Sequence, residues 1–276
     1  MSTAAATRDL SRPRSAWKRA SLIGHQFRFD LLSFMRNGQA RFATVIMPIL
    51  FLVIFIALFG NGRVPLGGGV TVSTSTYYIP GLTAFGIISP AYASLVVSVV
   101  RQRESGIFKR RRATPVPAFV PIAGRALVAV VAALLMYALL LAIGAVFYGS
   151  PLPTHTIPEV AFSAAGGAAS FCCVAFGVAS FVRSADAAQP VVQLTLLPLS
   201  FISGIFVPLN NVPGWLGTVA SYFPARPLPD ALRDCFDPAT TGAGINGGDL
   251  LVLGAWAAGG LLVALLRFSW VPRAAG

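Results

Sequence analysis

Charged residues are scarce in this chain. Asp, Glu, Lys and Arg make up 11% of its 276 residues, whereas 55% are hydrophobic, and soluble domains average about 25% charged residues. Several apolar runs approach or exceed the roughly 20 residues that a helix needs to cross a bilayer. The composition therefore excludes an ordinary soluble domain and predicts an all-α membrane protein that crosses the bilayer several times.

Lysine is nearly absent, since only Lys18 and Lys109 occur and each is followed by arginine. A Walker A loop needs Gly-Lys-Ser or Gly-Lys-Thr, so the chain is not a P-loop ATPase. Zinc-protease and nucleophile-elbow motifs are missing as well. The three cysteines form no disulfide framework, and no Cys/His set has metal-ligand spacing. We therefore expect no catalytic residue, no metal and no cofactor in this chain.

Carboxylates are missing from the middle of every apolar run. Glu159 and Asp249 stand at the ends of runs, and the other acids lie between runs. Proton-coupled carriers usually need an ionisable group within the membrane. An ion-coupled carrier is therefore the weakest alternative, and energy supplied by a partner protein is the better explanation.

The net charge of +12 is distributed along the chain in a way that argues against nucleic-acid binding. With six spans and the N-terminus inside, 18 of the 21 basic residues fall on the cytoplasmic side, as the positive-inside rule requires. The composition, rich in Ala, Gly, Pro and Arg, suggests a GC-rich bacterial source. We expect a multi-pass protein of the bacterial inner (plasma) membrane with both termini cytoplasmic and no nucleic-acid partner. Spans are expected at about 42–60, 77–100, 126–148, 160–182, 187–209 and 250–266.

The chain before the first span is expected to stay out of the bilayer core. Residues 1–15 are small, polar and basic, which predicts a disordered cytoplasmic tail. Residues 16–40 predict an amphipathic helix that lies in the headgroup layer; a helix packed on the cytoplasmic side is the alternative. Residues 41–276 are expected to form one transmembrane domain, with short outer re-entrant helices between the fifth and sixth spans.

Two segments carry the motif information. Residues 101–117 read RQRESGIFKRRRATPVP, and residues 203–216 read SGIFVPLNNVPGWL, with FPARPLPDALRD shortly after. Membrane orientation and contact with anionic lipid explain the arginines of the first segment. They do not explain Glu104, which can pair with Arg101 or Arg103 and fix the turn.

The chain resembles the membrane subunits of ABC-2 type transporters, such as the daunorubicin-resistance exporters. Its first segment is similar to the family's E-x-G…(T/S)-P pattern, with Ile107 where the family has threonine. Its second segment is similar to the family's S-G…P-x-W-L signature. The resemblance implies a non-enzymatic permease and a separate ABC ATPase (nucleotide-binding) subunit that binds ATP and Mg²⁺. It also implies pairing with a second copy or a paralogous permease.

The resemblance assigns roles to residues in both segments. The first segment would dock on the ATPase as a coupling element, with topology alone as the alternative; Trp215 equally suits an interfacial aromatic belt. Expected coupling residues are Glu104, Gly106, Phe108, Lys109, Arg110, Arg111, Arg112 and Pro115. Expected outer-gate residues are Ser203, Gly204, Pro208, Pro213 and Trp215. Phe85, Tyr92 and Phe206 are expected to line the substrate path, with ordinary helix packing as the alternative.

The function expected from these features is ATP-driven export. The apolar and aromatic character of the expected path favours a small hydrophobic or amphipathic substrate, such as a drug, antibiotic, lipid or glycolipid. A non-transporting membrane scaffold or immunity protein with the same fold is the main alternative. A Walker-type ATPase encoded beside this gene would favour export, and a partner without Walker motifs would favour the scaffold.

Overall fold

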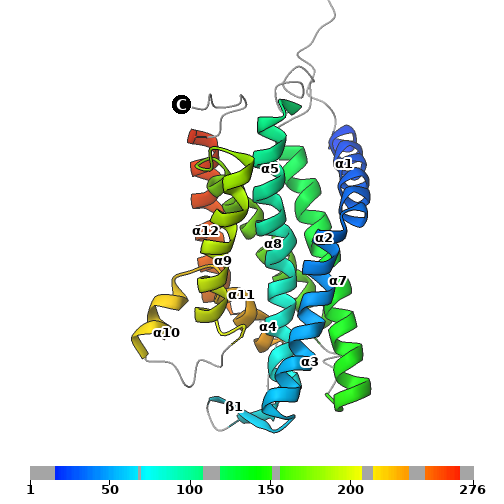
Figure 1. The fold of residues 1–276 in the computed structure, drawn as a ribbon, viewed down its shortest axis with the longest axis vertical. Coiled ribbons are helices and arrows are strands. Elements are labelled where there is room, and N and C mark those ends of the chain that lie inside the picture. Colours follow the sequence, from blue (N-terminus) through cyan, green and yellow to red (C-terminus); the bar gives the residue numbers. More distant parts are fainter. Residues whose placement is uncertain are drawn as a thin grey trace, which may run out of the picture.

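The computed structural model describes residues 16–67, 70–107, 119–150, 156–206, 214–235 and 246–267. They form a bundle of helices with a short β-hairpin at one end (Figure 1), and this confirms the expected all-α membrane fold class. The first half contains α1 (Ala16–Arg36), α2 (Gly38–Arg41), η1 (Phe42–Ile46), α3 (Met47–Phe59), β1 (Arg63–Gly67), β2 (Val70–Ser73), α4 (Thr74–Ile88), η2 (Ser89–Ser94) and α5 (Leu95–Glu104). The second half contains α7 (Phe119–Tyr148), α8 (Ile157–Ala179), α9 (Ala185–Ile202), α10 (Gly214–Ser221), α11 (Pro227–Asp234) and α12 (Gly247–Arg267).

The centre of the bundle is a continuous helical rod made of α4, η2 and α5. It runs for 31 residues and contains Pro80 and Pro90. Pro90 lies in the first turn of η2, a π-helical turn. Proline has no backbone N–H to donate, and the wider winding of the π-helix makes room for its ring. Every residue of α4 except Phe85 is buried. The rod therefore positions the helices around it.

Helix α1 is docked along α7 rather than standing apart from the bundle (Figure 1). Asp30 is only 6% exposed, and its carboxylate lies 3.2 Å from the guanidinium of Arg125 on α7. A side chain at Gly124 would clash with Gln26 of α1, because a Cβ there would lie 2.7 Å from the Gln26 side chain. The glycine therefore permits the close approach. The headgroup-layer position of this helix stays a prediction.

Helices α8 and α12 form the other close pair. A Cβ at Gly260 would lie 2.7 Å from the backbone nitrogen of Val174, so only glycine fits this crossing. The hydroxyl of Ser170 donates a 2.7 Å hydrogen bond to the carbonyl of Leu253. The two helices end close together, since Arg267 of α12 stacks on Phe181, just after α8, at 5.3 Å from its ring centroid.

All six expected spans contain a helix, but the helices differ in length. Four are long and apolar enough to cross a membrane, and a shorter apolar helix covers Thr44–Phe59. Helix α9 ends at Ile202, before the expected end of the fifth span at residue 209. Gly204 has a φ of 78°, a left-handed conformation that ends the helix there. The number of spans stays a prediction.

The segment after α3 contains an antiparallel hairpin, β1–β2, that the sequence analysis did not predict. Arg63 pairs with Ser73 at its open end. The Ser73 side chain then caps α4 by accepting the backbone N–H of Thr76. The hairpin therefore leads directly into the central rod, and it marks the end of the bundle that we call the hairpin end (Figure 1).

Candidate functional site

The predicted coupling segment begins where α5 ends. Gly106 has a φ of 71°, and its N–H donates to the carbonyl of Arg103 at 3.1 Å. This is a glycine C-terminal cap, in which the missing Cβ permits the left-handed turn. Of the eight expected coupling residues, Glu104 and Gly106 are described. The others lie outside the described residues: Phe108, Lys109, Arg110, Arg111, Arg112 and Pro115.

Arg103 and Glu104 together hold the turn between α8 and α9, and we call this pair the α8–α9 clamp. Arg103 is 1% exposed, and its guanidinium donates to the carbonyls of Ala179, at 3.1 Å, and Val182. The Glu104 carboxylate accepts the N–H of Ala185, the first residue of α9, at 2.9 Å. A cation thus lies at the C-terminal end of one helix and an anion at the N-terminal end of the next, which matches both helix dipoles.

The clamp gives Glu104 a partner that the sequence analysis did not anticipate. The expected interaction was a local pair with Arg101 or Arg103. Instead the Glu104 carboxylate accepts a hydrogen bond from α9, 81 residues further along the chain. Arg103 donates to a carbonyl at the end of α8. The start of the predicted coupling segment is therefore fixed to two helices besides its own.

A polar cavity of about 340 Å³ lies beside this end of the rod, between α1, η2, α5, α7 and α9. Arg125 donates to the Ser98 hydroxyl at 3.1 Å while it pairs with Asp30. Gln102 donates to the same hydroxyl at 2.8 Å. Polar groups are costly among lipid chains unless they face protein or water. The cavity is therefore a polar recess among apolar helices.

A cluster of phenylalanine rings lies toward the hairpin end, and we call it the phenylalanine cluster. Phe206 is its centre, with ring centroids 5.1 Å from Phe51, 5.4 Å from Phe85 and 5.4 Å from Phe201. Phe55 of α3 lies 6.1 Å from Phe206. Such tilted and edge-to-face contacts are the favourable geometries for aromatic rings. The rings of α3, α4 and the segment after α9 thus form one continuous apolar surface.

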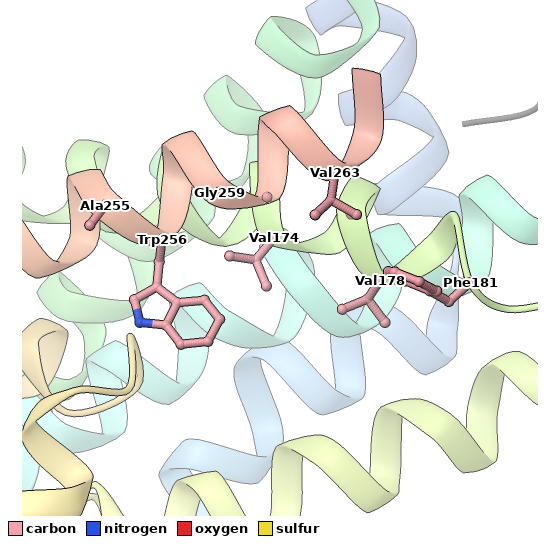
Figure 2. Close-up of a pocket in the computed structure, with 9 residues that line it drawn as sticks. Val174, Val178, Phe181, Ala255, Trp256, Gly259 and Val263 are labelled. Atoms are coloured by element: carbon pink, nitrogen blue, oxygen red, sulfur yellow. The ribbon is translucent and has the colours of Figure 1, made fainter. Parts of the chain in front are cut away.

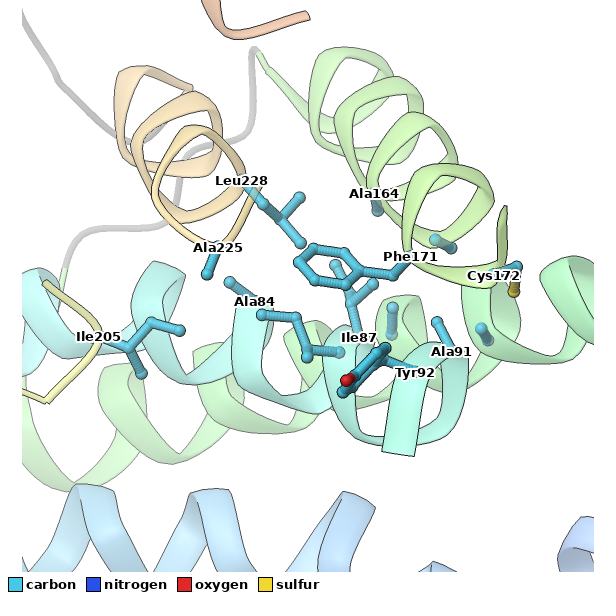
Figure 3. Packing of buried hydrophobic residues seen from close by; sticks show 14 of the residues in the cluster. Ala84, Ile87, Ala91, Tyr92, Ala164, Phe171, Cys172, Ile205, Ala225 and Leu228 are labelled. Carbon is cyan, nitrogen blue, oxygen red and sulfur yellow. The ribbon is translucent and has the colours of Figure 1, made fainter. Parts of the chain in front are cut away.

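Phe85 and Phe206 both lie in this cluster, and Tyr92 does not join it. The substrate path itself stays a prediction. Tyr92 is 5% exposed, and its hydroxyl lies 2.6 Å from that of Thr195. Its ring is in the buried core near Phe171 of α8 (Figure 3). Tyr92 lies within the π-helical turn η2, whereas Phe85 lies before it in α4. Because that turn winds more residues per turn than an α-helix, the two rings point in different directions.

The expected outer-gate residues Ser203 and Gly204 lie in the turn that follows α9. The Gly204 carbonyl accepts hydrogen bonds from the hydroxyl of Tyr77, at 3.3 Å, and from Arg233. Ser203 donates to the Ser200 carbonyl at 3.0 Å. The turn is therefore held between α4 and α11. Trp215 lies on α10 and is 68% exposed, and Pro208 and Pro213 lie outside the described residues.

Asp230 organises the segment after this turn, and the sequence analysis gave it no site role. Its carboxylate lies 2.8 Å from Arg233 and 3.2 Å from Arg226. Arg226 also donates to the Gly217 carbonyl of α10, and the guanidinium of Arg233 stacks on Tyr77 at 4.6 Å. The spacing of one acid between two arginines, at i−4 and i+3 of a helix, was the available signal.

Helix α11 is anchored at its C-terminal end as well. The hydroxyl of Thr156, just before α8, donates to the carbonyl of Cys235. Burial raises the pKa of the Cys235 thiol to about 11, so this side chain stays protonated at neutral pH and behaves as a small apolar group. Residues 203–206 and 214–235 thus pack into the bundle at several points.

Comparison with known proteins agrees with these features. The family model for ABC-2 type transporters matches residues 23–236. The inner membrane transport permease YadH of Escherichia coli strain K12 is 26% identical over 178 residues, which cover 63% of this chain and 68% of that protein. The protein of the same name from Shigella flexneri matches with the same identity and coverage. The matched region contains the α8–α9 clamp, the phenylalanine cluster and Asp230, and the chain belongs to the ABC-2 type transporter family, as a non-enzymatic transmembrane transport subunit.

Proposed function

We propose that the chain is the permease subunit of an ATP-driven exporter that moves a hydrophobic or amphipathic substrate out of the cell. A separate ABC ATPase subunit binds ATP and Mg²⁺ and docks on residues 101–117. The observation that carries this proposal is the α8–α9 clamp. It fastens the start of the docking segment to α9, which is 18 residues long and extends to the phenylalanine cluster.

The clamp supports a mechanical route for coupling. ATP binding closes the ATPase pair and displaces the docking segment. Because Arg103 and Glu104 hold the α8–α9 turn, the displacement passes to the first turn of α9. The helix then transmits it over about 27 Å to Phe201 and Phe206. Access to the path thus switches between two arrangements that the ATPase stabilises to different degrees.

The two surfaces along this route favour an amphipathic cargo. The polar cavity next to Arg101 and Arg125 suits a headgroup, and the phenylalanine cluster suits an apolar tail. Helix α9 also exposes Leu194, Leu197 and Phe201 on one stripe. An apolar stripe beside the proposed path favours a partner permease, either a second copy or a paralogue.

Mild solubilisation of a tagged chain, followed by mass spectrometry of what co-purifies, tests the proposal. We expect a stoichiometric Walker-motif ATPase that is lost when residues 109–112 are all replaced by alanine. A matched control replaces Arg8, Arg12, Arg14 and Lys18 instead and retains the ATPase. If no ATPase co-purifies even when the neighbouring gene is co-expressed, the chain is a scaffold of the same fold.

The same complex tests the clamp. Glu104→Ala is expected to leave membrane insertion and ATPase binding intact and to lower substrate-stimulated ATP hydrolysis several-fold, because the end of α5 loses the carboxylate that accepts the Ala185 N–H of α9. Asp186→Ala is the control, since Asp186 is an exposed carboxylate in the same first turn of α9. Equal stimulation in the Glu104→Ala and Asp186→Ala complexes would remove the clamp from the coupling route.

A further inference from the structure

An apolar groove of about 470 Å³ runs along the α8–α12 pair (Figure 2). Val174 and Val178 of α8 form one wall, and Val263 of α12 forms part of the other. The Trp256 indole points into the groove from α12 (Figure 2). Its N–H donates to the carbonyl of Tyr222 at 2.6 Å, which holds the ring in place.

The groove exists because α12 presents glycine on this face. A Cβ at Gly259 would meet nothing within 4 Å, so a side chain there would extend into open space. The adjacent Gly260 is in contact with the backbone of α8, which brings the two helices close together and makes the floor of the groove. A missing side chain next to a tight crossing leaves a slot between the helices.

The surroundings of the groove are those of a membrane helix facing lipid. Only 11% of the apolar window of α12 is buried within the structure. Leu262, Leu265 and Leu266 are 57%, 75% and 76% exposed. An exposed leucine-rich surface on a helix of spanning length lies among acyl chains. The occupant of the groove is therefore drawn from the bilayer.

Trp256, which lines the groove, and Arg267, which lies over the lining residue Phe181, define the occupant further. Trp256 and Arg267 are eleven residues apart, which corresponds to about 16 Å along a helix. One leaflet contributes roughly half of the ~30 Å hydrocarbon core. Arg267 is exposed, and its guanidinium lies over the ring of Phe181. Stacking fixes the plane of a guanidinium while its N–H groups remain free to bind phosphate.

We propose that this groove binds one acyl chain of an anionic phospholipid, with the lipid phosphate on Arg267 and the end of the chain near Trp256. The chain fits the slot left by Gly259, and the charge on Arg267 selects an anionic headgroup. The lipid would hold α12 against α8 along the groove, over their glycine contact. The site needs neither an ATPase nor a transported substrate, so it stands apart from the function proposed above.

Quenching of Trp256 fluorescence by brominated lipid tests the proposal. The full chain, with Trp17, Trp215 and Trp270 replaced by phenylalanine, is reconstituted into nanodiscs of phosphatidylcholine. Phosphatidylglycerol or phosphatidylcholine with brominated acyl chains is added at equal mole fraction. We expect phosphatidylglycerol to compete for the groove roughly fivefold better, as one basic residue at an anionic surface predicts.

Substitutions then separate the two parts of the site. Arg267→Gln should make the two brominated lipids equal quenchers, whereas Arg63→Gln, which removes an exposed arginine from β1, should leave the preference unchanged. Gly259→Leu should fill the slot and weaken quenching by both lipids. Gly254→Leu is its control, because Gly254 also has open space around its Cβ but does not line the groove.

Three results would overturn the proposal. Equal quenching by both lipids in the unsubstituted background would mean that the groove does not select the headgroup. A preference that persists in Arg267→Gln would place the selecting charge elsewhere. Protection of Trp256 from both lipids would mean that protein, such as a second copy of the chain, covers the groove.

Discussion

The central rod and α12 are both long apolar helices, yet they occupy opposite environments. In the rod, 67% of the most apolar window is buried, against 11% in α12. Leu82 of α4 is fully buried, whereas Leu262 of α12 is 57% exposed. Apolar character therefore reports that a segment belongs in a membrane, and does not report which other helices surround it.

Polar side chains are what distinguish the two helices. The rod contains buried hydroxyl groups that bond across the bundle, such as Ser75 to Ser150 at 2.7 Å and Tyr77 to Gly204 at 3.3 Å. Lipid chains offer no hydrogen-bond partner, so polar groups turn toward protein. Between Leu250 and Leu266, α12 has only the Trp256 N–H as a polar side-chain group. In a membrane bundle, polar residues mark the helix at the centre.

The largest effect on stability is expected in the buried core of the central rod, compared with the exposed face of α12. Leu82→Ala removes a side chain from the packed core of the rod and leaves a cavity, which costs about 2–5 kcal/mol. Leu262→Ala removes the same atoms from a surface that lipid or detergent can refill, and its effect should be within about 0.5 kcal/mol. Unfolding of both variants in mixed micelles with increasing dodecyl sulfate measures the difference. Equal losses would mean that α12 is packed against protein over that face.

A smaller effect is expected at the end of the rod. Arg103→Gln removes the guanidinium that donates to the carbonyls of Ala179 and Val182. These acceptors then lack this donor, which should lower the free energy of unfolding by about 1–3 kcal/mol. Arg101→Gln changes the same charge two residues earlier at an exposed position and should change stability little. The same micelle titration compares them. If Arg101→Gln is as damaging as Arg103→Gln, net charge rather than the α8–α9 clamp stabilises this end.

The sequence predicted the helices better than their arrangement. Apolar runs placed a helix in each of the six expected spans because length and composition are local properties. The clamp could not be foreseen, since Arg103 and Arg101 look alike when arginines are counted for orientation. Only the fold brings Arg103 to the end of α8, 76 residues away.

The candidate site shows the same division between local and long-range information. Phe85 and Phe206 were both expected on the path, and the structure brings their rings to 5.4 Å. Tyr92 was grouped with them, but a π-helical turn turns it toward Thr195. Nothing in the composition of residues 89–94 beyond Pro90 signals that turn. Asp230 was visible in its motif, although its two arginine partners became clear only in the folded segment.

The smallest expected effect concerns the link between the two regions of the comparison, at the α8–α12 contact. Ser170→Ala removes the 2.7 Å hydrogen bond to the Leu253 carbonyl, and interhelical bonds of this kind contribute about 0.6 kcal/mol on average in membranes. Because α12 contacts the bundle mainly through α8 and α11, the loss should be local. Hydrogen exchange should accelerate across residues 247–267 and stay unchanged in the rod.

Tyr92→Phe is the counterpart, since it removes the 2.6 Å contact to Thr195 in the core and should lower the stability of the whole bundle by a similar amount. Faster exchange in the rod of Ser170→Ala would mean that α12 unfolds together with the centre, and that its exposed position does not make it independent.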